Sequence, residues 1–139
     1  GMGGMLVCRI LEQSPEVMQE VSTLVIQAQS DLYEVRKMIH KIGFFIENEK
    51  FCMDAGKPYL VMRAVRGEEK TPYEPAEHEY GRLLPEVSDT AYRKFLLDER
   101  DKKMKLQETL NMQKTSGAGA RVEELTEEIT GLNWILNKF

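Results

Sequence analysis

The sequence is poor in the residues that most often carry out chemistry. Its 139 residues include two cysteines, two histidines and one tryptophan. Cys8 and Cys52 lie far apart and form no C-x-x-C pair, so we expect two reduced thiols rather than a disulfide framework or a zinc site. Neither His40 nor His78 lies three residues after a glutamate, which excludes the Glu-x-x-His repeat of carboxylate di-iron bundles.

The sequence also lacks the short motifs that hold a nucleophile or a phosphate group. It has no G-x-S-x-G, no P-loop and no G-x-G-x-x-G. Gly117 and Gly119 form a GAG triplet, which is too short for a phosphate cradle. The sequence therefore favours a non-catalytic role, and it predicts no cofactor and no metal ion.

Long apolar runs and an excess of basic residues are also absent. No run approaches the roughly 20 residues of a membrane span, and the N-terminus does not resemble a secretion signal. The formal charge is −4, from 19 basic and 23 acidic residues, which argues against a general affinity for nucleic acid. We therefore expect a cytoplasmic protein with no membrane partner and with nucleic acid an unlikely one.

The dominant pattern is an apolar stripe that predicts one long helix over about 15–55. Pro15 follows the potential N-cap Ser14, and Gly56 is placed to end the helix. Because glycine is unfavourable inside a helix, we expect a bend near Gly43. The stripe has the three- and four-residue spacing of a helix face and consists of Val17, Val21, Leu24, Ala28, Leu32, Val35, Ile39, Ile42 and Ile46.

Two short apolar runs, 5–11 and 58–66, fit either a helix or a strand. If both are strands, they could pair as a small two-stranded ribbon. The acidic segment over about 67–87 contains Pro72, Pro75 and Pro85, so we expect it to be mostly irregular.

The C-terminal part predicts two helices, over about 89–114 and 121–138, joined by a hinge at 115–120. Because the hinge is short, we expect an antiparallel hairpin. The last helix carries a coiled-coil-like seam of Leu125, Ile129, Leu132, Leu136 and Phe139. The predicted fold is thus a mostly α, three- to four-helix bundle that forms a single domain over 1–139.

More apolar helix surface is present than a small bundle needs, which favours helix-mediated association. We expect a scaffold, adaptor or subunit that binds itself or another helical protein through the seam at Leu125–Phe139. One alternative is a regulator that binds nucleic acid through the helix face Arg93–Lys105. Another is a small ligand- or metal-binding bundle that uses a loop site of Tyr73, His78 and Tyr80.

Overall fold

The computed structural model describes residues 3–113 and 117–139. The chain divides into two compact units, Gly1–Leu84 and Pro85–Phe139. A single domain over 1–139 stays a prediction. None of the helices described has an apolar stretch of the length that a membrane span needs.

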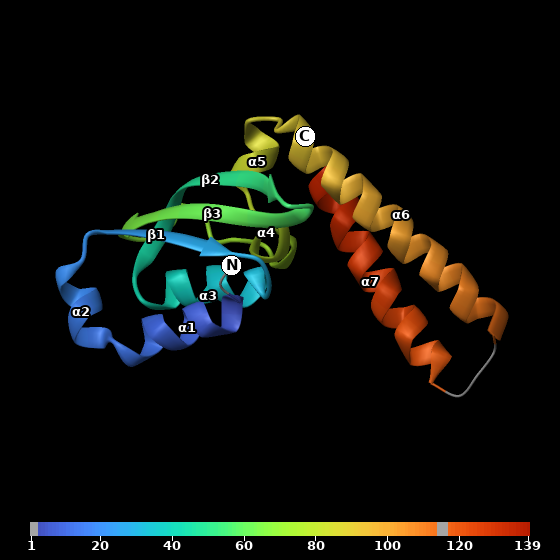
Figure 1. Ribbon diagram of the computed structural model, residues 1–139, viewed down its shortest axis with the longest axis horizontal. Coiled ribbons are helices and arrows are strands. Elements are labelled where there is room, and N and C mark those ends of the chain that lie inside the picture. The colour runs from blue at the N-terminus through green and yellow to red at the C-terminus, as the bar shows by residue number, and fades with distance from the viewer. Residues whose placement is uncertain (1–2, 114–116) are drawn as a thin grey trace. The chain divides into compact units, whose positions relative to one another are not determined.

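The first unit is a three-stranded sheet with helices packed on it (Figure 1). The strands lie in the order β1-β3-β2, and β3 is antiparallel to both neighbours, so β1 and β2 run parallel. Helix α3 connects these two parallel strands, which makes β1-α3-β2 a crossover unit. In chain order the elements are α1 (Gly4–Gln13), α2 (Pro15–Glu20), β1 (Thr23–Ala28), α3 (Leu32–Lys41), β2 (Phe44–Asp54), β3 (Lys57–Arg66), α4 (Pro75–Tyr80) and α5 (Leu83–Glu86), which spans the boundary between the units.

The prediction of a mostly helical bundle with one long helix over 15–55 is wrong. That range holds α2, β1, α3 and β2. Gly43 does not bend a helix: its φ of +87° lies in a turn that ends α3 and starts β2. Residues 21–26 are rich in β-branched side chains, which favour a strand. The residues of the predicted stripe therefore belong to separate helices and strands. Each of these elements is too short for its own hydrophobic period to stand out in the sequence.

The two short runs that fitted either a helix or a strand form different elements. Residues 5–11 lie in α1, where the buried Val7, Cys8 and Leu11 follow helix spacing. Residues 58–66 lie in β3, the central strand. The predicted ribbon is therefore wrong, because β3 pairs with β1 and β2 rather than with residues 5–11.

The core of the first unit lies between the sheet and its helices, with α1 and α3 packed against each other on one face (Figure 1). Alternate residues of the strands point to this face, as the pleat requires, except where a β-bulge between Ile46 and Asn48 interrupts the alternation in β2. The buried apolar side chains come from all three strands and from α3, and include Ile26, Ala28, Phe44, Ile46, Leu60, Met62, Ala64, Val35 and Ile39.

A buried ion pair lies within this core. Arg36 of α3 donates from Nε to Glu49 Oε1 of β2 over 2.8 Å, and both side chains are fully buried. Arg36 Nη1 also donates to the carbonyl oxygens of His78 and Glu79, over 2.7 and 2.9 Å. One guanidinium therefore joins α3, β2 and α4 through charge-assisted hydrogen bonds.

Gly81 lets the chain after α4 approach this ion pair closely. Its φ is +91°, and a Cβ atom there would collide with the Glu49 carboxylate and lie 3.0 Å from Arg36 Nη2. A glycine is required at this position for both reasons, the left-handed backbone and the lack of space.

The second unit is a helical hairpin of α6 (Thr90–Gln113) and α7 (Ala118–Leu136), which pack against each other. These bounds lie close to the predicted 89–114 and 121–138. Asp89 caps α6, since its Oδ1 accepts the Tyr92 N–H over 2.8 Å. Residues 115 and 116 of the predicted hinge lie outside the described residues, and α7 already begins at Ala118.

Removing the Glu49 carboxylate should strongly destabilise the first unit. Glu49→Ala leaves Arg36 charged and buried, and we expect the free energy of unfolding to fall by about 3–5 kcal/mol. The matched control is Glu47→Ala on the same strand, whose exposed pair with Arg63 should be worth less than about 1 kcal/mol. Urea unfolding measures both variants, and equal losses would contradict a central role for the buried pair.

Candidate functional site

The crossover unit indicates which edge of the sheet can hold a ligand. In open sheets with parallel strands, ligands bind beyond the carboxyl ends of those strands. The carboxyl end of β1 is Ala28, and the chain then turns through Gln29, Ser30 and Asp31 into α3. We call residues 29–31 the β1 rim.

The N-terminus of α1 packs directly on the β1 rim. The Gly4 N–H donates to Ser30 Oγ over 3.2 Å, and a Cβ at Gly4 would collide with the Ser30 carbonyl oxygen. Asp31 adopts a left-handed backbone, with φ of +53°, and is exposed. The rim is thus shaped by close backbone packing, and it leaves an exposed carboxylate at the edge where ligands bind in this architecture.

A second cluster lies at the opposite edge, around the end of α3 and the start of β2. His40 Nδ1 and His78 Nε2 are 3.1 Å apart, and His40 Nε2 lies 2.7 Å from Glu69 Oε2. Tyr73 packs on both imidazoles, with ring centroids 4.7 Å from His40 and 5.3 Å from His78. These side chains line a pocket of about 370 Å³ together with Lys37, Phe44, Glu68 and Pro72.

Hydrogen bonding determines how this cluster can hold protons. A carboxylate only accepts, so His40 Nε2 carries the hydrogen toward Glu69. Two imidazolium rings would set N–H against N–H between His40 and His78, so the pair shares one hydrogen. Separately, the pKa of His78 is lowered to about 4, by burial first and then by the charges of His40 and Lys37.

Burial raises the pKa of the Tyr73 phenol, and the carboxylates of Glu49 and Glu69 raise it further. Tyr73 therefore stays protonated, and the Arg82 guanidinium lies 4.3 Å from the centroid of its ring. Arg82 is itself held by Glu77 through hydrogen bonds of 2.5 and 3.0 Å. The cluster is a polar network at the edge away from the β1 rim. Within the described residues, the buried Tyr73 hydroxyl has no hydrogen-bond partner in it.

The structure brings together Tyr73 and His78 of the predicted loop site, whose rings are neighbours. The third residue, Tyr80, lies at the end of α4 and is half-buried. Sequence reasoning missed His40 and Glu69 as members of the cluster. His40 is 38 residues from His78 and 29 from Glu69, so no local spacing shows these contacts. A ligand site at Tyr73, His78 and Tyr80 stays a prediction.

The predicted seam lies on α7 of the helical hairpin up to Leu136, and Phe139 lies three residues beyond the end of this helix. Leu125 and Leu132 are fully buried within this unit, while Ile129, Leu136 and Phe139 are half-buried. The seam thus supports packing of α7 on α6. Its use as an interface with another protein stays a prediction.

The basic face Arg93–Lys105 lies on α6, and part of its charge is neutralised. Lys103 pairs with Glu128 over 2.9 Å, and Lys102 lies 3.6 Å from Glu99. Arg100 donates to the Asn133 side chain over 2.9 Å. These contacts occupy half of the six cations of this face within the hairpin itself.

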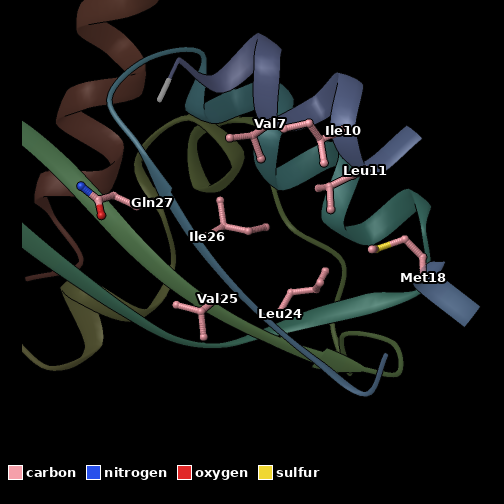
Figure 2. A pocket seen from close by; sticks show the side chains of 8 residues that line it. All are labelled: Val7, Ile10, Leu11, Met18, Leu24, Val25, Ile26 and Gln27. Carbon is pink, nitrogen blue, oxygen red and sulfur yellow. The ribbon is translucent and has the colours of Figure 1, made fainter. Parts of the chain in front are cut away.

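An apolar pocket of about 430 Å³ lies between α1, α2 and the edge strand β1 (Figure 2). Gln27 is the one polar side chain in a lining of Val7, Ile10, Leu11, Met18, Leu24, Val25, Ile26 and Gln27. The lining has no titratable group, so this pocket cannot donate or accept a proton. It can only bind an apolar surface. In the part of the chain that the structure describes, no three His, Cys, Asp or Glu side chains are grouped to hold a metal ion.

The histidine cluster predicts a loss of stability in acid. The pKa of His78 lies near 4 when folded and near 6.5 when unfolded, so the unfolded chain binds more protons between these values. We expect the free energy of unfolding to fall as the pH drops from about 6.5 to 4. His78→Gln should flatten this fall in urea titrations, and an unchanged pH slope in the variant would contradict His78 as its cause.

Comparison with known proteins identifies a family. Residues 1–133 match the model of the family described as TrmK, tRNA (adenine(22)-N(1))-methyltransferase. No curated protein matches the chain.

Solved structures share the fold at low sequence identity. An uncharacterised protein of Listeria monocytogenes serotype 4b has a TM-score of 0.90 at 20% identity, and the match covers 98% of this chain and 60% of that one. The m1A22 tRNA methyltransferase TrmK of B. subtilis has a TM-score of 0.84 at 20% identity, with 98% and 60% covered. TrmK of M. capricolum, in complex with the cofactor product S-adenosyl-homocysteine, has 0.79 at 17%, with 99% and 57% covered.

The chain therefore spans about 60% of the length of these solved relatives. The shared fold is Rossmann-like, in agreement with the β1-α3-β2 crossover.

The family match overturns the predicted function. The predictions of a non-catalytic association module and of nucleic acid as an unlikely partner are wrong, because the family is one of tRNA-modifying enzymes. The predicted helical bundle is wrong as well. The two alternative predictions, a nucleic-acid-binding regulator and a ligand-binding bundle, do not fit the family match any better. The chain belongs to the TrmK family of tRNA (adenine(22)-N(1))-methyltransferases.

Proposed function

We propose that the protein carrying this chain methylates N1 of adenine 22 in tRNA. The observation that carries this proposal is the family match, which extends over residues 1–133. The fold shared with B. subtilis TrmK over 98% of the chain supports it. The chain spans about 60% of that relative, so the activity is proposed for the protein as a whole.

The methyl donor proposed for this reaction is S-adenosylmethionine. The M. capricolum relative was solved with S-adenosyl-homocysteine as its cofactor product, which is the donor without its methyl group. We infer the cytoplasm as the place of reaction.

The described residues do not by themselves form a site for this cofactor. The turn after β1 has no glycine, so it offers no glycine-rich cradle. Gly4 lies beside the rim, but Ser30 of the protein already fills the space at its Cα. The space beside the Cα of Gly81 is likewise filled, by the side chains of Glu49 and Arg36.

The contribution of this chain to the reaction would be the β1 rim and the elements that hold it. The Arg36–Glu49 pair fixes α3 against β2, and α3 begins directly after the rim. The Gly4–Ser30 hydrogen bond fixes α1 to the same rim. This arrangement supports a rigid edge against which a nucleotide could be positioned.

Methyl transfer to defined tRNA transcripts tests the proposal. The protein at its natural length should transfer labelled methyl groups from S-adenosylmethionine to a transcript with adenine at position 22, and primer extension should stop there. The control transcript has guanine at that position and should stay unlabelled. Absence of label, or label in both transcripts, would contradict the proposed function.

A further inference from the structure

The β2–β3 hairpin extends past the carboxyl end of β1. Ala28, the last residue of β1, pairs with Leu60 of β3, and Leu60 pairs with Phe51 of β2. β2 continues from Phe51 to Asp54 before the chain turns back into β3. At about 3.3 Å per residue, the tip over 52–59 projects roughly 10 Å beyond the level where β1 ends.

The hairpin tip is short and stiff. Its two turn residues, Ala55 and Gly56, have φ of +50° and +77°, the backbone of a type I′ turn. The strands stay paired up to the turn, with Cys52 opposite Tyr59 and Asp54 opposite Lys57. A preformed element of this kind loses little conformational entropy when it binds a partner.

The side chains at the tip suit a nucleotide. Met53 is 57% exposed and shares a strand face with Phe51, which is half-buried. A thioether packs readily on a flat ring, and a nucleobase is a flat ring system. Lys57 is exposed four residues away and can pair with a phosphate, although Asp54, which is paired with Lys57 across the turn, offsets part of its attraction for a phosphate.

The tip is at the edge of the sheet that binds ligands in this architecture. The carboxyl ends of β1 and β2 face the same way, so the β1 rim and the hairpin tip lie at one edge. The histidine cluster and α2 lie toward the other edge, where β1 and β2 begin.

We propose that the hairpin tip 52–59 forms a wall of the tRNA-binding side of the active site. This inference rests on the proposed function and adds positioning residues to it. Met53 packs against a nucleoside next to the target adenine, and Lys57 pairs with a neighbouring phosphate. Neither residue takes part in the chemical step.

The test is a set of steady-state measurements with a tRNA transcript at saturating S-adenosylmethionine. The double variant Met53→Ala, Lys57→Ala should raise KM for tRNA about tenfold, while kcat changes less than about twofold. KM for S-adenosylmethionine should stay unchanged, because the tip contacts only the RNA.

The matched control is Val17→Ala with Lys41→Ala. Val17 on α2 is 55% exposed, and the Lys41 side chain at the end of α3 is 69% exposed. Both precede strands and so lie away from the carboxyl ends. Thermal unfolding of both double variants checks that they fold.

The outcomes separate the two proposals. If the wild-type protein does not methylate adenine 22, the proposed function fails and the role of the tip fails with it. If the wild type is active and the tip variant matches the control, only the inference about the tip is overturned. A fall in kcat at unchanged KM for tRNA would also overturn it.

Discussion

The first unit depends on one buried guanidinium. Arg36 is fully buried and is acceptable there only because Glu49 neutralises it and the carbonyl oxygens of His78 and Glu79 accept hydrogen bonds from it. Desolvating such a pair is costly, so its stabilising effect depends on good hydrogen bonding. The same contacts fix α3, β2 and α4 in one arrangement, and Gly81 makes room for it. The edges of the sheet, including the β1 rim, take their position from this arrangement.

Local patterns predicted the helical hairpin well and the sheet poorly. The 3-4 spacing from Leu125 to Leu136 belongs to a single helix, so its period is visible in the sequence. In residues 15–55 the same spacing arose across two strands and two helices, and Gly43 looked like a bend rather than a boundary. Pairing of β3 with β1 is a long-range property that no short window contains. The β2–β3 hairpin is local, but Gly56 of its turn was taken as the end of a helix.

The site residues show the same difference between local patterns and long-range contacts. Tyr73 and His78 are five residues apart, and the sequence singled out both. His40 lies 38 residues from His78 and 29 from Glu69, so their contacts could not be read from spacing. The β1 rim had no signal either, because Gly4 and Ser30 act through backbone packing rather than through a recognisable motif. Catalytic motifs were absent from the sequence, and the predicted association module followed from that absence.

The most direct measurement is the modification state of adenine 22 in living cells. Reverse transcription of tRNA should stop at position 22 in cells that contain this protein, pass through that position after its gene is deleted, and stop again when the gene is restored. A stop that persists after deletion, or one that never forms at position 22, would contradict the assignment of this protein to adenine 22 methylation.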